Sequence, residues 1–116
     1  MDEPEYIEVD MIKDTRVFDK NDVQIGKIDD LLIDRANNRV ACAVFSFGAH
    51  LLGLGNKYFL IPLEAFKYGQ HGEDYILDLD KETLENEEGF DRNEPVTQAD
   101  LSEAYTQYML KPYWEK

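Results

Sequence analysis

The stretch 23–34 most constrains the fold, because its apolar residues change phase partway along. The apolar positions are odd, then even, then odd again: Val23, Ile25, Ile28, Leu31 and Ile33. A regular strand keeps its apolar side chains at one parity, since successive side chains point to opposite faces. Gly26 lies where the phase slips, which predicts a β-bulge or sharp coil of the kind that closes a small barrel.

A second strand over 40–47 follows the turn 35–38, whose two asparagines tolerate positive φ, so the pair predicts a hairpin. Both faces of this strand are apolar: Ala41, Ala43, Phe45 and Phe47 on one, and Val40, Cys42, Val44 and Ser46 on the other. An antiparallel strand with one wet face should instead alternate. We therefore expect the exterior of the hairpin to be covered, either by a C-terminal helix or by a second copy of the chain.

The remaining segments complete a mainly β fold. Short strands are predicted at 15–18, 58–61 and 75–79, with Asp19, Asn21 and Asp22 supplying side-chain-to-backbone bonds in the first turn. The segment 63–68 is predicted as a turn or short bend, and 80–85 as one helical turn. We expect a small antiparallel β-barrel followed by an amphipathic helix.

The C-terminal helix is predicted from its cap and its spacing. Thr97 precedes it, and Asp100 follows three residues later, as in a capping box. Its apolar residues fall on one helical face: Leu101, Ala104, Tyr105, Tyr108 and Met109. Pro112 stops the helix, and Tyr113 and Trp114 form an aromatic tail.

The charge of the chain restricts its partners. With 116 residues the chain is one domain by length, and its net charge is −13, from 12 Lys+Arg against 25 Asp+Glu. Between Glu73 and Glu103 there are 12 acidic residues and two basic ones. Such a surface repels phosphate backbones and anionic membranes, so direct nucleic-acid binding is not expected. It attracts basic proteins or cations, although solubility alone is the simpler explanation.

Targeting signals and cysteine content indicate a cytoplasmic protein. The single cysteine, Cys42, excludes an internal disulfide framework. The acidic N-terminus resembles no signal peptide, and no run reaches the roughly 20 apolar residues of a membrane span, so no membrane insertion is expected.

Several short motifs, in their order and spacing, resemble the PRC-barrel family. They are Ile25-Gly26-Lys27-Ile28 with Leu32-Ile33-Asp34, Arg39-Val40, Phe47-Gly48 with Gly53-Leu54-Gly55, Ile61-Pro62-Leu63, and Leu79-Asp80-Lys81-Glu82 with Gly89-Phe90. The resemblance covers residues 14–91, which leaves an N-terminal extension at 1–13 and the helix with its aromatic tail at 92–116.

The resemblance implies a non-enzymatic protein-interaction or adaptor module. The family's barrel occurs in the cytoplasmic part of the photosynthetic reaction-centre H subunit, in the C-terminal domain of a ribosome-maturation factor, and in stand-alone proteins, which this chain resembles most. The alternatives are an accessory role in ribosome or RNA maturation, a soluble relative of the H subunit, and, least favoured, a metal-dependent protein using His50 and His71. Fold-level analogy alone does not choose among them.

Candidate catalytic or metal-binding groups have simpler explanations. His50 and His71 lie in glycine-flanked loops without metal-ligand spacing, although Glu64, Glu73 or Asp74 can come near them. Cys42 lies mid-strand between alanines, which predicts an inert, buried thiol. The carboxylate pairs Asp29/Asp30 and Asp78/Asp80 are expected by chance in so acidic a chain. We therefore predict no enzyme activity, no cofactor and no metal.

Apolar and aromatic residues are the better candidates for binding. The leucines of the loop GAHLLGLG, residues 48–55, are either tucked over the barrel mouth or offered to a partner. Tyrosine and tryptophan are enriched at protein interfaces. The predicted interaction residues are Leu51, Leu52, Leu54, Val40, Cys42, Val44, Tyr105, Tyr108, Tyr113 and Trp114. We expect a protein partner and a homo-oligomer, most simply a dimer.

Overall fold

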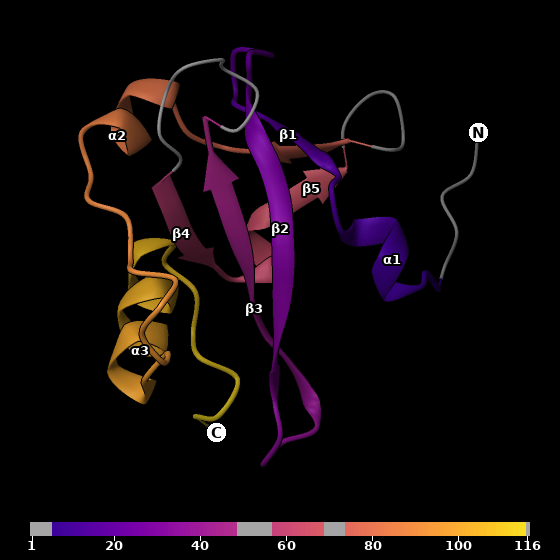
Figure 1. Ribbon diagram of the computed structural model, residues 1–116, viewed down its shortest axis with the longest axis vertical. Coiled ribbons are helices and arrows are strands. Elements are labelled where there is room, and N and C mark those ends of the chain that lie inside the picture. Colours follow the sequence, from indigo (N-terminus) through magenta and orange to yellow (C-terminus); the bar gives the residue numbers. More distant parts are fainter. Residues whose placement is uncertain (1–5, 49–56, 69–73, 116) are drawn as a thin grey trace.

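A computed structural model describes residues 6–48, 57–68 and 74–115 as one curled sheet with three helices and a short 3-10 turn (Figure 1). The helices are α1 (Val9–Ile12), α2 (Lys81–Glu85) and α3 (Gln98–Gln107), and the 3-10 turn covers Leu63–Ala65. The strands are β1 (Arg16–Phe18), β2 (Gln24–Asp34), β3 (Arg39–Phe47), β4 (Lys57–Ile61), β5 (Phe66–Tyr68) and β6 (Tyr75–Leu77). The predicted mainly β fold with a C-terminal helix is confirmed.

The sheet is a half-barrel with strand order β4-β3-β2-β1-β6-β5. Every neighbouring pair is antiparallel except β1 and β6, which run parallel. The sheet therefore departs from the all-antiparallel prediction at one pair. Strand β5 lies in a segment predicted as a turn, because three residues with one buried side chain, Phe66, are too short to show a strand pattern.

The bulge predicted near Gly26 is present. Val17 pairs with Gly26 and Phe18 with Gln24, so Ile25 is the extra residue. Glycine is required next to it because β2 and β3 approach closely: a Cβ on Gly26 would lie 2.0 Å from the carbonyl oxygen of Ser46. The bulge lets both Ile25 and Ile28 enter the core, although their positions differ in parity.

Two further register shifts bend the long hairpin of β2 and β3. One leaves Asp29 unpaired on β2, and the other leaves Ala41 unpaired on β3. Because of the second shift, Val40 packs against the core cluster that contains Ala43 and Phe45. The prediction that Val40 lies on the outer face, which rested on simple alternation, is therefore wrong. The turn itself is as predicted, because Asn38 adopts a positive φ of 53°.

The buried carboxylate of Asp19 connects two segments that lie far apart in the sequence. Asp19, 2% exposed, accepts hydrogen bonds from the backbone amides of Asn21 at 2.9 Å and Val23 at 3.0 Å. Its other oxygen accepts from the backbone amide of Lys81 at 3.1 Å, at the start of α2. The turn chemistry predicted for Asp19 is confirmed, and Asp19 also connects the first turn to α2.

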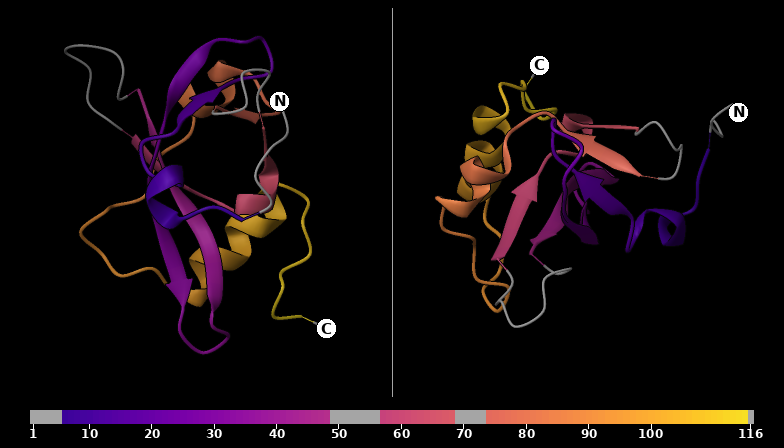
Figure 2. Two further views of the ribbon diagram at one scale, coloured as in Figure 1. Left: turned by 90° about the vertical axis from the view of Figure 1, so that its right-hand side faces the viewer. Right: turned by 90° about the horizontal axis from the view of Figure 1, so that it is seen from above.

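The two shorter helices, α1 and α2, lie at opposite sides of the sheet (Figure 2). On α1, Ile12 is buried in the core, so part of the N-terminal segment is ordered against the barrel. On α2, Leu84 is fully buried. None of the helices in the described part of the chain is long and apolar enough to cross a bilayer.

Helix α3 begins and ends with defined caps. Thr97 Oγ1 accepts from the amide of Asp100, and the Asp100 carboxylate accepts from the amide of Thr97, which completes the predicted capping box. At the other end, the amide of Leu110 donates to Tyr105 O and that of Met109 to Thr106 O, a Schellman motif. Met109 occupies its left-handed position with φ of 56° and is 93% exposed, so its predicted place on the apolar face is wrong.

Candidate interaction site

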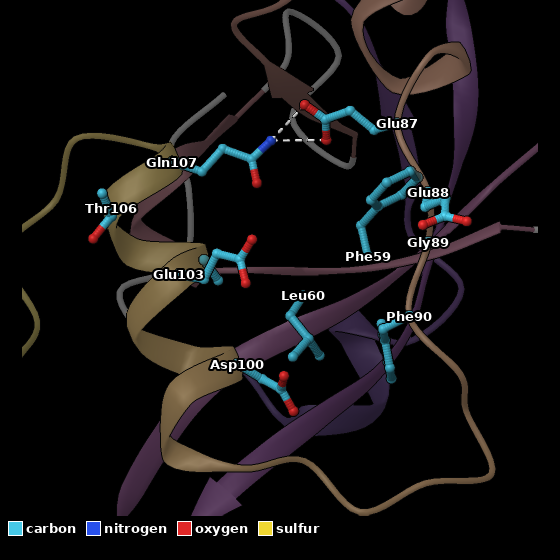
Figure 3. Close-up of a pocket in the computed structure, with 11 residues that line it drawn as sticks. Phe59, Leu60, Glu87, Glu88, Gly89, Phe90, Asp100, Glu103, Thr106 and Gln107 are labelled. Atoms are coloured by element: carbon cyan, nitrogen blue, oxygen red, sulfur yellow. Dashed lines mark hydrogen bonds between the residues drawn. The ribbon is translucent and has the colours of Figure 1, made fainter.

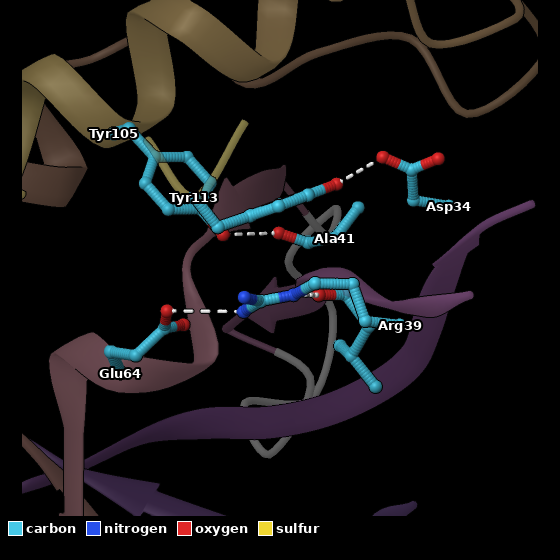
Figure 4. Close-up of polar contacts among 7 residues, drawn as sticks. Asp34, Arg39, Ala41, Glu64, Tyr105 and Tyr113 are labelled. Atoms are coloured by element: carbon cyan, nitrogen blue, oxygen red, sulfur yellow. Dashed lines mark hydrogen bonds and ion pairs between the residues drawn. The ribbon is translucent and has the colours of Figure 1, made fainter. Parts of the chain in front are cut away.

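Two surfaces flank α3, and the first is a closed cluster that we call the clasp. It consists of Asp34 from β2, Arg39 from β3, Tyr105 from α3, and Tyr113 and Trp114 from the C-terminal segment. Figure 4 shows the ring of Tyr113 over the Arg39 guanidinium, with the Tyr113 hydroxyl directed at Asp34. The Schellman motif turns the chain after α3, so the segment that follows returns to the β2–β3 hairpin.

Tyr105 is the centre of the clasp. Its side chain is fully buried, and its hydroxyl donates a hydrogen bond to the Ala41 carbonyl oxygen at 2.7 Å. Burial raises the pKa of Tyr105 to about 12, because the charged phenolate loses its hydration. The phenol therefore stays neutral and fastens α3 to the carbonyl of a bulged residue in β3.

A series of polar contacts runs through the outer part of the clasp, from Asp34 through Tyr113 and Arg39 to Glu64. The Tyr113 hydroxyl donates to the Asp34 carboxylate, and this bond is the main reason that the pKa of Asp34 falls to about 2. The guanidinium carbon of Arg39 lies 3.8 Å from the centroid of the Tyr113 ring, a cation–π contact. Arg39 also pairs with Glu64 at 3.3 Å, which connects the clasp to the 3-10 turn.

The aromatic rings of the clasp pack edge to face. Their centroids are 5.3 Å apart for Tyr105 and Trp114 and 4.9 Å apart for Tyr113 and Trp114. On the strand beside them, Cys42 and Val44 are fully buried within one chain. Of the two covers that we considered for the hairpin exterior, the C-terminal helix and its tail contact the hairpin through Tyr105 and Tyr113. Cys42 and Val44 need no second copy of the chain to be buried.

Burial also determines the chemistry of the only thiol. It raises the pKa of Cys42 to about 12, so almost none of the reactive thiolate is present at neutral pH. Both Cys42 and Val44 are fully buried, so a partner reaches either side chain only if the segments that cover it move. The thiol therefore acts as a packing group in this arrangement.

The second surface is an open groove on the other flank of α3, with a volume of about 660 Å³. Figure 3 shows segment 87–90 facing α3 across the side chains of Phe59 and Leu60. The lining residues are Phe59, Leu60, Glu87, Glu88, Gly89, Phe90, Asp100, Glu103, Ala104, Thr106 and Gln107. We call this set the groove; its floor is apolar, and both of its walls carry carboxylates.

The wall of the groove opposite α3 is held against β4. A Cβ on Gly89 would lie 2.7 Å from the carbonyl oxygen of Tyr58, so only glycine permits this approach. The amide of Phe90 donates to that same oxygen at 2.8 Å. Lys57 Nζ donates to the carbonyl oxygens of Glu85 at 2.7 Å and Glu87 at 3.0 Å. These bonds fix the distance between the wall and the strand.

One hydrogen-bond pair links the two walls across the top of the groove. Gln107 Nε2 on α3 lies 2.8 Å from each oxygen of the Glu87 carboxylate. The carboxylates of Glu88, Asp100 and Glu103 are exposed. The groove therefore offers negative charge around a partly open apolar surface.

The described part of the structure does not bring the predicted binding residues together on one surface. Tyr105, Tyr113 and Trp114 meet in the clasp, while Tyr108 packs against the core, where burial raises its pKa. Val40 is half-buried, and Cys42 and Val44 are covered as described above. The loop leucines Leu51, Leu52 and Leu54 lie outside the described residues, as do His50, His71 and Glu73.

The remaining candidate carboxylates serve local contacts. Asp74 is 3% exposed and accepts two hydrogen bonds from Arg16, at 3.0 and 3.1 Å. Asp29 pairs with Arg92 at 3.0 Å, and Asp80 accepts from Asn21 at 2.8 Å. Within the described ranges, no three His, Cys, Asp or Glu side chains converge as metal ligands.

Sequence reasoning missed the groove, although a signal for it was present. The acidic excess between Glu73 and Glu103 marks both walls, but we attributed it to solubility. What the sequence does not reveal is that Phe59 and Leu60, about 40 residues before α3, form the floor between those walls. The Arg39–Tyr113 contact joins residues 74 positions apart and likewise carries no local pattern.

Comparison with known proteins gives a family match and a distant structural match. The model of the PRC-barrel domain family matches residues 4–84. No curated protein matches the chain. A crystal structure described as the 16S ribosomal RNA processing protein RimM of Pseudomonas aeruginosa matches with 18% sequence identity and a TM-score of 0.45. That match covers 69% of this chain and 48% of the other, so the chain spans about half of that protein's length.

Proposed function

The chain belongs to the PRC-barrel domain family, and on this premise we propose that it is a non-enzymatic protein-interaction module. The observation that carries the proposal is the groove between α3 and segment 87–90. It pairs an open apolar floor with carboxylate walls, whereas the comparable surface on the other flank of α3 is already covered by the chain itself. An exposed apolar hollow with a polar rim is typical of a protein contact.

The buried reactive groups of the described residues support the same proposal, because they are used within the fold. The Cys42 thiol is buried with a raised pKa. The buried carboxylates of Asp19 and Asp74 bind backbone amides and Arg16, respectively. Catalysis needs groups that are free to meet a substrate. These groups instead stabilise the barrel.

Self-association and the cellular role stay predictions. Cys42 and Val44 on the exterior of the hairpin do not require a second copy, because they are already buried within one chain. A homo-oligomer would therefore use another surface. The alternatives of ribosome maturation and of a reaction-centre relative rest on the family resemblance, and no residue contact described above favours either of them.

Affinity capture tests the proposed function. The tagged chain is incubated with extract of its source cells at physiological salt, and bound proteins are displaced with untagged chain. We expect one partner that saturates, is displaced, and re-forms the complex when both proteins are purified. If nothing is displaced by the untagged chain, or if the purified chain turns over a substrate, the proposal is wrong.

A further inference from the structure

We propose that the groove binds an extended segment of a partner protein that carries lysine or arginine residues and one large apolar side chain. This inference rests on the proposed function and specifies the chemistry of the partner. Three observations support it: the sign of the charge on the walls, the apolar floor, and the rigidity of the frame.

The charge of the groove selects a cationic partner. Each wall carries two carboxylates, from Glu87 and Glu88 on one side and from Asp100 and Glu103 on the other. Among the described residues that line the groove there is no lysine, arginine or histidine, while Lys57 Nζ binds the backbone carbonyl of Glu87. The net charge of −13 extends this field beyond the groove. Such a field accelerates the approach of a basic segment and repels nucleic acid and acidic peptides.

The floor of the groove selects an apolar anchor between the charges. Phe59 is 8% exposed, and Leu60 and Phe90 are half-buried, so part of each side chain still meets solvent. An inorganic cation gains nothing from such a surface. A leucine-sized side chain that covers the floor gains ~1.5 kcal/mol or more, which corresponds to roughly tenfold in affinity.

The size and frame of the groove favour an extended segment. A volume of about 660 Å³ holds a few side chains, and a single turn of a helix of ~10–12 Å diameter and ~5.4 Å pitch would by itself fill most of it. The walls are fixed before binding by the Gly89 contact with Tyr58 and by the bond between Gln107 and Glu87. A preformed site loses little conformational entropy when it binds.

The test measures fluorescence anisotropy with a dye-labelled short peptide of alternating lysine and leucine, added to the full chain. Two control peptides replace leucine with serine or lysine with glutamate. We expect the lysine–leucine peptide to bind at least roughly tenfold more tightly than the lysine–serine peptide, and the glutamate peptide not to bind. Equal affinity for the two lysine peptides overturns the proposal, because it indicates diffuse attraction to an acidic protein.

Matched variants locate the binding site. The double variant Glu88→Gln/Glu103→Gln removes two charges from the groove, and Asp78→Asn/Glu82→Gln removes two exposed charges elsewhere. Asp100 is left intact because it caps α3. We expect the groove variant to weaken peptide binding at least fivefold and the control variant less than twofold. Equal losses overturn the proposal.

A third variant tests the floor, and the combined outcomes separate the two proposals. Leu60→Thr keeps a strand-forming residue and removes most of the apolar surface, so we expect it to abolish the preference for leucine over serine peptides. An unchanged preference overturns the proposal. If the captured partner binds but the lysine–leucine peptide does not, the groove inference fails while the interaction function stands. If the peptide binds in the groove and no partner is captured, the groove has the proposed binding chemistry, but the interaction function fails.

Discussion

The clasp and the groove lie on two flanks of the same helix. They differ in whether their apolar side chains are buried by the chain itself or left partly exposed to solvent. On the clasp side, Tyr105 is fully buried and its hydroxyl is bonded to Ala41. On the groove side, Leu60 stays partly open between carboxylates. The same helix therefore fixes the fold with one flank and presents a surface with the other.

This difference teaches how to separate stability from recognition in a small domain. Side chains that are buried and hydrogen-bonded contribute to the free energy of unfolding, and exposed carboxylates contribute little to it. Substitutions in the clasp should therefore change stability, and substitutions in the groove should change binding. The following predictions test that division, from the largest expected effect to the smallest.

Tyr105→Ala should have the largest effect. It removes a fully buried aromatic side chain together with its hydrogen bond, and we expect the free energy of unfolding to fall by ~3–5 kcal/mol. Urea denaturation followed by circular dichroism measures the change. Tyr105→Phe keeps the ring and should lose only ~1 kcal/mol. Similar losses in both variants would contradict the packing role of the ring.

Trp114→Ala should loosen the clasp without unfolding the barrel. The indole packs against Tyr105 and Tyr113, so its removal makes local opening over Cys42 easier. We expect Cys42 to react with a thiol reagent roughly tenfold faster in the variant at neutral pH. Met11→Ala, on the exposed side of α1, serves as the control and should leave the labelling rate unchanged. A rate unaffected by Trp114→Ala would show that the segment does not cover the thiol.

Tyr113→Phe should change the pH dependence of stability below about pH 4. The folded pKa of Asp34 is lowered to about 2 from its ordinary value of 3.8, so its contribution to stability is present above pH ~4 and is lost as the pH falls towards 2. The variant lacks the hydroxyl that is the main cause of that shift. We expect the stability difference between the two proteins to shrink as the pH falls, measured by urea denaturation at each pH. A difference that grows at low pH would have the wrong sign.

Met109→Gly should stabilise the chain slightly. Met109 holds the left-handed position of the Schellman motif, where glycine avoids the steric penalty of a Cβ. Because the side chain is 93% exposed, little packing is lost, and we expect a gain of ~0.5–1 kcal/mol in the free energy of unfolding. Lys111→Gly, two residues on and without positive φ, should not stabilise. A loss at Met109→Gly would mean that the methionine has a packing role.

Glu88→Gln/Glu103→Gln should have the smallest effect on stability. Both side chains are exposed, so we expect a change within ~0.5 kcal/mol in thermal or urea unfolding. A destabilisation as large as that of Tyr105→Phe would show that the groove, like the clasp, belongs to the structural part of the molecule.

Much of the fold follows from short-range patterns. The phase slip at Gly26, the side-chain bonds of Asp19 and the capping box of Thr97 each depend on residues a few positions apart, and all three are present. The family resemblance seen in the motifs is confirmed by the family match. These features could be predicted because backbone geometry and side-chain spacing determine them locally.

The rest depends on contacts that no local pattern encodes. The unpaired Ala41 reverses the expected side of Val40, and the Schellman motif removes Met109 from the face of its helix. The clasp joins residues 79 positions apart through the bond of Tyr113 to Asp34. The groove likewise requires the position of α3 relative to β4, which tertiary packing alone decides.

The most direct test of this division is a chemical-shift map of the isotopically labelled chain titrated with the lysine–leucine peptide. We predict that the amide shifts concentrate in the groove, at residues 59–60, 87–90, 100, 103–104 and 106–107. The resonances of Asp34, Arg39 and residues 113–114 of the clasp should stay in place. Shifts centred on the clasp, or scattered evenly over the acidic surface, would contradict the account.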